Sequence, residues 1–332
     1  MLYLHGIGHF HPESVIDNAF LEALDIGTTN EWILERVGIE RRRTVLSLDY
    51  IRSTRNADPR AAHEASLYSN AETAARAVEM ALARAGLQAS DIGMVIAGGC
   101  SPQYLIPAEA CIVAEKLGVS VPAFDVSSAC STFLAQINVL EGMRPEKLPE
   151  FILLVSAENN TRTVDYSDRS TAGLWGDGTS AAIVSARTPA RAVIRDVMFQ
   201  TDPTGWEKVR IPAGGFFAQE GSAVQMFAIR KTSATARELL ARVPDDQRER
   251  AWFIGHQANL GMLRSSVSRS GIDEARHLHN VVRFGNTGAA GAPTVLSQNW
   301  ESFADGDLLA LVVVGSGLSW GGALISFEGE GG

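Results

Sequence analysis

Three chemically versatile side chains, Cys130, His256 and Asn286, each follow a short apolar run and precede small residues. A thiolate is a strong nucleophile, an imidazole exchanges protons, and an amide N–H donates to an oxyanion without adding charge. In open α/β sheets, functional residues gather just beyond the carboxyl ends of the strands. The shared placement of Cys130 and His256 therefore indicates nucleophilic catalysis by a cysteine.

The segment around Cys130 predicts a short strand, a turn of small residues and then a helix over 131–140. A helix N-terminus stabilises a thiolate, because its free amides and its dipole both favour negative charge. We expect Ser127 or Ser128 to cap this helix. Free cysteine is otherwise most often a small buried hydrophobe, so this segment alone leaves a structural role for the thiol equally open.

The histidine and the asparagine also have ordinary structural explanations. A lone histidine after an apolar run, as at His256, is more often a core residue, and an asparagine such as Asn286 is common in tight turns. A predicted strand ends before Asn286, where Gly285 and Gly288 allow close approach of the backbone. The Gly-rich turn at Ser316 can present N–H groups to an oxyanion or a phosphate, but the P-loop pattern is missing.

The elements that must position these residues alternate between buried strands and helices. Strands are predicted over 92–99, 151–157, 181–184 and 308–315. Helices are predicted over 70–85, 108–117, 131–140, 232–242 and 260–270. This alternation predicts an α/β layered fold with a largely parallel sheet.

The length of 332 residues is long for one compact core and suits two fused halves. We expect an N-terminal half over 1–186 that carries the cysteine. A C-terminal half over 187–332 then carries the histidine and the asparagine. The charged, irregular segment 45–69 contains Pro59, and we expect it to be a surface insertion.

The composition disfavours several classes of protein. The net charge of −9 argues against contact with nucleic acid, and no apolar stretch reaches the length of a membrane span. The N-terminus lacks a secretory signal pattern, which favours a cytoplasmic location. Cys100, Cys111 and Cys130 form neither an even framework nor a CxxC pair, so we expect no disulfide scaffold and no metal site.

Six motifs, taken in chain order, resemble those of the ketoacyl synthase III family of the thiolase superfamily, and the match covers nearly the whole chain. The motifs that carry the resemblance are Glu31–Arg42, Asp125–Cys130, Leu174–Gly178, His256–Asn259, Gly285–Thr287 and Gly315–Gly321. Any one motif is weak, whereas all of them in order and at compatible spacing are specific. The resemblance implies a thiolase-like five-layered α/β/α/β/α fold of two similar halves and a homodimer.

The same resemblance implies a condensing acyltransferase and a role for each residue. Cys130 would take an acyl group from a coenzyme A or acyl carrier protein thioester, with the backbone amides of Cys130 and Ser316 as the oxyanion hole. His256 and Asn286 would then bind a malonyl or β-ketoacyl thioester for a decarboxylative Claisen condensation. The thioesters are substrates, and no cofactor is expected to be bound permanently.

Further site residues are assigned through the resemblance alone. It implies that Trp32 stacks on the adenine of coenzyme A and that Arg36 and Arg162 contact its phosphates. Outside the resemblance, Trp32 is equally a half-buried packing residue. Leu105 and Ile106 correspond to a dimer loop that lines the acyl pocket of the partner subunit.

The sequence departs from the family pattern at several positions. Ile106 and Val314 replace aromatic residues, which implies a wider acyl pocket and an altered extender step. Gly261 replaces a basic residue of the docking patch for acyl carrier protein. Segment 45–69 resembles that of synthases that join two acyl chains in dialkylresorcinol-type metabolism, so fatty-acid and secondary-metabolite pathways both remain open.

Two other functions also remain open from the sequence. Acyl transfer to an oxygen or nitrogen acceptor uses a similar cysteine and histidine without condensation, although Asn286 favours condensation. A non-catalytic partner subunit of a condensing enzyme is the third hypothesis, and the presence of Cys130 argues against it.

Overall fold

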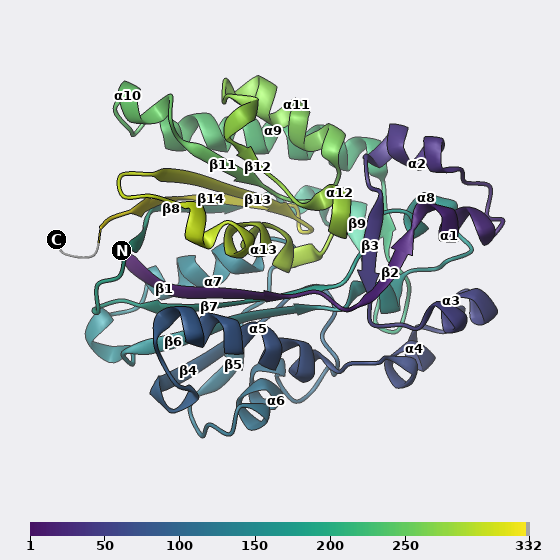
Figure 1. The fold of residues 1–332 in the computed structure, drawn as a ribbon, viewed down its shortest axis with the longest axis horizontal. Helices are drawn as coiled ribbons and strands as arrows, with labels where there is room; N and C mark the ends of the chain where they lie inside the picture. Colours follow the sequence, from purple (N-terminus) through teal and green to yellow (C-terminus); the bar gives the residue numbers. More distant parts are fainter. Residues whose placement is uncertain (330–332) are drawn as a thin grey trace.

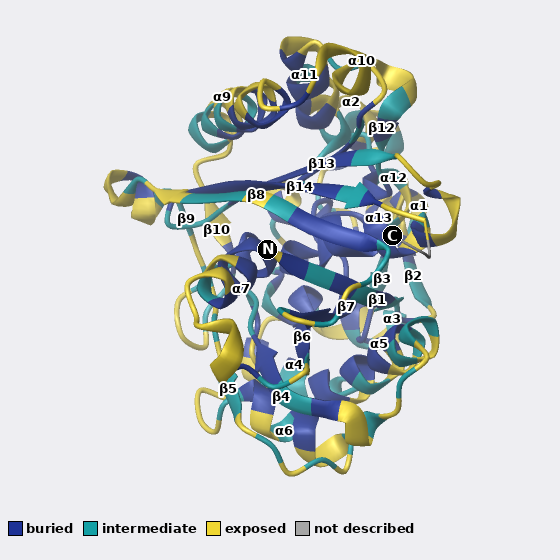
Figure 2. Ribbon diagram, turned by 90° about the vertical axis from the view of Figure 1, so that its left-hand side faces the viewer, coloured by how far each residue is buried: buried dark blue, intermediate teal, exposed yellow. Residues whose placement is uncertain are grey.

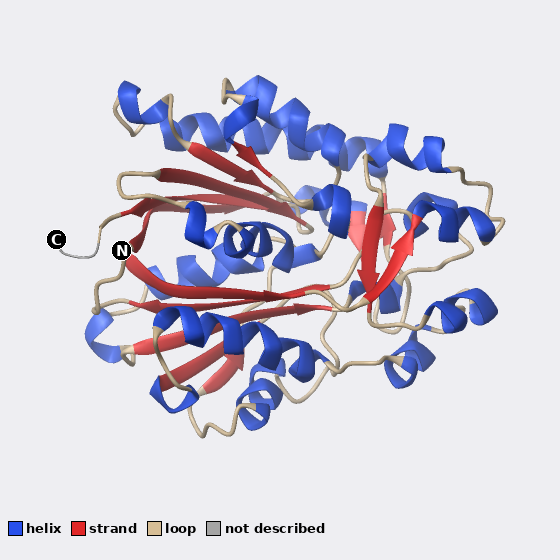
Figure 3. Ribbon diagram, viewed as in Figure 1, coloured by secondary structure: helices blue, strands red, loops and turns tan. Residues whose placement is uncertain are grey.

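A ten-stranded mixed sheet forms the centre of the computed structural model, which describes residues 1–329 (Figure 1, Figure 3). In spatial order the strands are β12 (His277–Leu278), β11 (Trp252–Gly255), β13 (Leu308–Gly315), β14 (Ser319–Phe327), β8 (Ala192–Thr201), β1 (Leu2–Phe10), β7 (Gly178–Ser185), β6 (Phe151–Glu158), β4 (Ile92–Ala97) and β5 (Ala123–Asp125). Two small sheets pair β2 (Ser14–Asp17) with β3 (Arg41–Thr44) and β9 (Val209–Arg210) with β10 (Ala218–Gln219).

Helices cover the outer faces of this sheet, and two of them lie between its two halves. They are α1 (Asn18–Ala23), α2 (Asn30–Val37), α3 (Leu48–Thr54), α4 (Pro59–Ala65), α5 (Asn70–Ala85), α6 (Glu109–Lys116), α7 (Thr132–Glu141), α8 (Arg169–Ala172), α9 (Gly221–Leu240), α10 (Asp245–Arg248), α11 (Leu260–Ser270), α12 (Val281–Phe284) and α13 (Gly291–Gln298).

Each half of the large sheet repeats one pattern of strand pairing. From the centre outward, β1-β7-β6-β4-β5 matches β8-β14-β13-β11-β12, with antiparallel contacts first and parallel contacts after them. The two series join where β1 runs antiparallel to β8, with Leu2 opposite Ile194. The two similar halves are confirmed. The prediction of a largely parallel sheet is wrong, because β7 and β14 each run antiparallel to both neighbours.

The layers follow from how the helices cover these two series (Figure 1). α5 and α6 cover the outer face of the N-terminal series, α9 and α11 cover the outer face of the C-terminal series, and α7 and α13 lie between them. α7 contacts β6 and β14, while α13 contacts β1 and β11, so each central helix touches both series. The five-layered α/β/α/β/α fold is confirmed, and Figure 2 shows the buried residues concentrated in its sheets and central helices.

Local sequence signals locate some helices well and others poorly. α5 and α11 span the predicted residues, and α5 begins with a capping box formed by Ser69 and Glu72. α9 begins at Gly221 rather than at residue 232. Its N-cap, Glu220, makes no capping hydrogen bond, so the sequence gives no start signal there.

Segment 45–69 is more ordered than the sequence predicts. It forms α3 and α4, which Ser47 and Asp58 cap through their side chains. Ile51 and Asn56 are fully buried, and the Asn56 side chain donates to the carbonyl oxygen of Arg162 (2.9 Å). The segment is therefore anchored to the body of the protein, although most of its polar side chains face solvent.

The loop between β7 and β8 separates the two sheet series along the chain. We propose that the boundary between the halves lies in this loop, at residues 186 and 187. Among residues 1–329, no helix combines the length and the apolar character needed to cross a membrane.

Candidate active site

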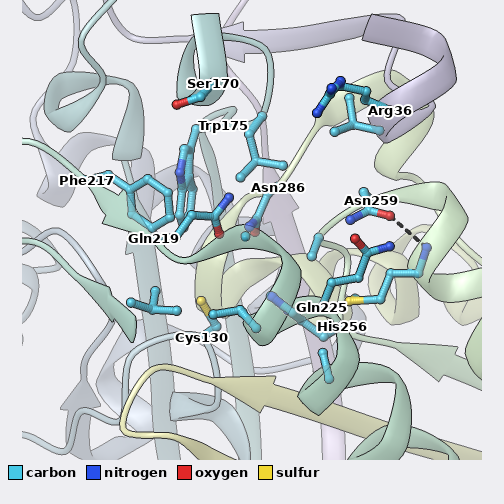
Figure 4. Close-up of a pocket in the computed structure, with 18 of the residues that line it drawn as sticks. Arg36, Cys130, Ser170, Trp175, Phe217, Gln219, Gln225, His256, Asn259 and Asn286 are labelled. Carbon is cyan, nitrogen blue, oxygen red and sulfur yellow. Dashed lines mark hydrogen bonds between the residues drawn. The ribbon is translucent and has the colours of Figure 1, made fainter. Parts of the chain in front are cut away.

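One cavity of about 540 Å³ brings together Cys130, His256 and Asn286, which lie far apart in the sequence (Figure 4). Cys130 belongs to the N-terminal half, and the other two belong to the C-terminal half. Cys130 follows β5, His256 follows β11, and Ser316 follows β13, so these residues gather beyond the carboxyl ends of strands. The cavity therefore lies at the junction of the two halves.

Cys130 lies in a tight turn between β5 and α7. Ala129 before it has a φ of 46°, a left-handed conformation that costs a non-glycine residue about 1–3 kcal/mol. The predicted cap by Ser127 or Ser128 is wrong, because the N-cap is Ser131. The Ser131 hydroxyl donates to the carbonyl oxygen of Ser128 (2.8 Å) and accepts no bond from the helix. The turn thus holds the thiol at the helix N-terminus.

The surroundings of Cys130 favour its thiolate. A hydrogen bond with the Cys100 thiol, at an Sγ–Sγ distance of 3.6 Å, is the main cause that lowers the pKa of Cys130 well below its ordinary value. Burial acts in the opposite direction, and the nearby His256 imidazole and the backbone lower the pKa further. Since the thiolate is the nucleophilic form, these contacts activate the residue.

His256 begins the loop after β11 and is 6% exposed. The buried Gln257 side chain fixes this loop: it donates to the carbonyl oxygen of Gly255 (2.7 Å) and accepts from the backbone N–H of Asn280 (3.0 Å). Asn259 then caps α11 through the N–H of Met262, a bond visible in Figure 4. The imidazole is thus held by a rigid loop at the cavity wall.

Asn286 follows a short helix, α12, so the strand predicted before it is wrong. Its backbone pairs instead with the segment at Trp175: the Asn286 N–H donates to Leu174 and the Gly176 N–H donates to Asn286, both at 3.0 Å. The side-chain Oδ1 accepts the N–H of Gly288 (3.0 Å). This bond orients the carboxamide and leaves Nδ2 as a donor for the cavity.

Ser316 is placed beside Cys130 by a close approach of two backbones. A Cβ atom on Gly315 would lie 2.9 Å from the amide nitrogen of Ser131 and 3.3 Å from that of Cys130, so only glycine fits there. Both Ser316 and the buried Val314 line the cavity. The arrangement suits an oxyanion hole made of the backbone N–H groups of Ser316, just after β13, and Cys130, just before α7.

Trp32 and Arg36 line the cavity at its rim, as the family resemblance implies. The Arg36 guanidinium lies 4.7 Å from the centre of the Trp32 ring, and that of Arg169 lies 4.8 Å from it. Arg169 also lines the cavity, and no spacing in the sequence singled it out. Planar cations over an aromatic ring form a surface suited to a nucleotide.

Arg162 does not belong to this site, which corrects its prediction as a phosphate ligand. Its side chain is fully buried and lies outside the cavity lining. The guanidinium donates to the Asn70 side chain and the Asn159 carbonyl oxygen, and it contacts His63 of α4. A guanidinium with these partners serves the packing of segment 45–69 and is closed to a phosphate.

Leu105 and Ile106 also lie outside the cavity of their own chain. Each is 85% exposed in the loop before α6. Within one chain these residues therefore do not form the acyl pocket, and any contribution must be made to another subunit.

The partly exposed Cys100 and the buried Glu158 lie next to the nucleophile, and neither was predicted from the sequence. Glu158 ends β6 and accepts the backbone N–H groups of Cys100 (2.9 and 3.0 Å) and Ala289 (2.9 Å). Burial, and then the negative charge of Cys130, raise the pKa of Glu158 to about 8. An acidic residue at the end of the mostly apolar run Phe151–Ala157 was the available signal. Across residues 1–329, no set of His, Cys, Asp and Glu side chains is arranged to hold a metal ion.

The chain is similar to a known family along its length. The family described as 3-oxoacyl-[acyl-carrier-protein] synthase III matches residues 124–203, and its C-terminal part matches residues 246–327. The β-ketoacyl-[acyl-carrier-protein] synthase III of Sulfurovum sp. is 31% identical, over 98% of this chain and 95% of the relative. That of Syntrophomonas wolfei is 32% identical, over 96% of both. The crystal structure of the Aquifex aeolicus synthase III has a TM-score of 0.86 at 27% identity, and covers 98% of this chain and 100% of that one.

We expect Cys130 to react with iodoacetamide at a pH where ordinary thiols, with a pKa of about 8.5, are protonated. Peptide mass spectrometry between about pH 6 and about pH 9 would give the rate of Cys130 alkylation as a function of pH, with N-acetylcysteine as the reference thiol. His256→Ala should move the Cys130 profile towards higher pH, because a contact that favours the thiolate is lost. A wild-type profile that coincides with that of N-acetylcysteine would contradict the activation of this thiol.

Proposed function

The chain belongs to the 3-oxoacyl-[acyl-carrier-protein] synthase III family, and from this membership we propose that Cys130 accepts an acyl group that His256 and Asn286 help to condense with a second thioester. The protein is accordingly a condensing acyltransferase. The observation that supports these residue roles is the convergence of all three side chains on one cavity.

In the first half-reaction, the Cys130 thiolate attacks the carbonyl carbon of an acyl thioester. The backbone N–H groups of Cys130 and Ser316 donate to the oxyanion of the tetrahedral intermediate. The C–S bond to the donor then breaks, the donor leaves as a thiolate, and the acyl group remains on Cys130. Coenzyme A and acyl carrier protein thioesters are the donors that fit this chemistry.

In the second half-reaction, a malonyl or β-ketoacyl thioester occupies the emptied cavity. His256 and the free Nδ2 of Asn286 donate hydrogen bonds to its thioester carbonyl. With a malonyl unit, the carboxylate leaves as CO₂ and its electron pair forms an enolate. The enolate attacks the acyl carbon on Cys130, and the Cys130 thiolate leaves. These hydrogen bonds stabilise the negative charge that develops on the enolate oxygen.

The position of Asn286 distinguishes condensation from simple acyl transfer. Asn286→Ala should leave acyl loading on Cys130 intact and lower condensation about 100-fold, the usual effect of losing one oxyanion donor. Intact-protein mass spectrometry would follow loading, and release of the β-keto product would follow condensation. The matched control is Gln225→Ala, which removes another carboxamide from the cavity wall. Undiminished condensation in Asn286→Ala would refute this role.

We also propose that Trp32, Arg36 and Arg169 bind the nucleotide part of coenzyme A. Arg36→Ala and Arg169→Ala should each raise the KM for an acyl-CoA about tenfold, equivalent to about 1.4 kcal/mol, and leave kcat unchanged. The same acyl group on N-acetylcysteamine lacks the nucleotide and should show no change. Arg52→Ala, on the exposed surface of α3, is the matched control. An equal rise in KM for the acyl-CoA and for the acyl-N-acetylcysteamine would overturn this assignment.

The homodimer is a further proposal, supported by the exposed apolar loop of Tyr104, Leu105 and Ile106. We propose that this loop packs against a second copy and extends towards its acyl channel. Sedimentation equilibrium should give twice the chain mass for the wild type, and Ile106→Asp should raise the dimer dissociation constant at least about tenfold. Met226→Asp charges another exposed apolar side chain and serves as the control. A monomeric wild type would refute the proposal.

The assignment to fatty-acid or secondary-metabolite biosynthesis stays a prediction. The narrower resemblance to dialkylresorcinol-type synthases agrees with the substitution at Ile106, which we propose widens the partner's acyl channel.

A further inference from the structure

A second thiol lies directly behind the proposed nucleophile. The Sγ atom of Cys100 is 3.6 Å from that of Cys130, within hydrogen-bonding reach for two sulfur atoms. Cys130 lines the cavity, whereas Cys100 is partly exposed but lies outside the cavity lining, so we assign the contact with substrate to Cys130. Any effect of Cys100 on the reaction must therefore pass through Cys130.

The loop that carries Cys100 is held firmly against the Cys130 turn. At Gly98, a Cβ atom would lie 2.2 Å from the carbonyl oxygen of Val126, so the two backbones touch. The Cys100 N–H donates to both carboxyl oxygens of Glu158, at 2.9 and 3.0 Å. Glu158 also holds Ala289, three residues after Asn286. The sulfur–sulfur contact is thus fixed by backbone from both halves of the protein.

The charges around the pair decide which sulfur keeps the proton. Cys130 lies at the N-terminus of α7 and near His256, and both favour an anion there. A negative charge on Cys100 would lie 3.6 Å from the Cys130 sulfur, so it is disfavoured once Cys130 is a thiolate. In agreement, the pKa of Cys100 is raised well above its usual value, first by its bond to Cys130 and then by burial. Cys100 is therefore the donor.

We propose that Cys100 is a positioning residue whose S–H group donates a hydrogen bond to the Cys130 thiolate and holds it ready for attack. This inference rests on the proposed role of Cys130 as the acyl acceptor. The bond acts at two moments of the cycle, since Cys130 is a thiolate before loading and again when it leaves the condensed product. A thioester sulfur carries no charge and accepts the bond weakly, so the donor favours release of the acyl group to the enolate.

The experiment compares Cys100→Ala, which loses the donor, with Cys100→Ser, which keeps an O–H donor in nearly the same place. Cys111→Ala, on the exposed face of α6, is the matched control for loss of a thiol. Two rates are measured between about pH 6 and about pH 9: alkylation of Cys130 by iodoacetamide, and acyl loading from one acyl-CoA. Thermal unfolding of each variant checks that the fold is kept.

We expect Cys100→Ala to shift both profiles upward by about one pH unit, so that the rates fall about tenfold near pH 6.5 and are unchanged near pH 9. Cys100→Ser should recover most of this loss, and Cys111→Ala should match the wild type. A Cys100→Ala profile identical to the wild type, or a loss of equal size at every pH, would overturn the inference. If the wild type takes up no acyl group, the proposed function fails, while the alkylation profiles still decide the role of Cys100.

Discussion

Close packing of backbone around Cys130 is the constraint on which the active site depends. The end of β13 contacts the start of α7 at Gly315, and the loop after β4 contacts the same turn at Gly98. A methyl group at Gly315 would push the proposed oxyanion-hole N–H of Ser316 away from Cys130. A methyl group at Gly98 would push the Cys100 loop away from the Cys130 turn. Because β13 and α7 belong to different halves, the site exists only when the halves are packed together.

The negative charge of the Cys130 thiolate is accommodated by several separate contacts rather than by a single salt bridge. The thiolate of Cys130 is stabilised by a helix N-terminus and hydrogen-bond donors, while the neighbouring Glu158 has its pKa raised to about 8. Two anions this close in a buried region repel each other strongly, so the carboxyl group favours its neutral form near neutral pH. In that form it still accepts backbone N–H groups and ties the Cys100 loop to the turn after Asn286.

Two arginines show how tertiary context decides what a charged residue does. The family resemblance assigns Arg162 to a phosphate of coenzyme A, yet its guanidinium is enclosed by Asn70, Asn159 and His63. No sequence pattern marks Arg169 as a site residue, yet its guanidinium lies over the Trp32 ring at the cavity. Burial separates the two, because a guanidinium surrounded by protein partners is closed to solvent and to substrate.

The sequence by itself determined the candidate residues, several core strands and most of the longer helices. Cys130, His256 and Asn286 stood out because they occur together in motifs of compatible order and spacing, and α5 followed from local capping and helical periodicity. Tertiary structure alone decided the antiparallel course of β7 and β14, the burial of Arg162 and the contact between Cys100 and Cys130. Apart from the β13–β14 hairpin, these features arise between segments distant in the chain, and local sequence patterns carry no information on the distances between such segments.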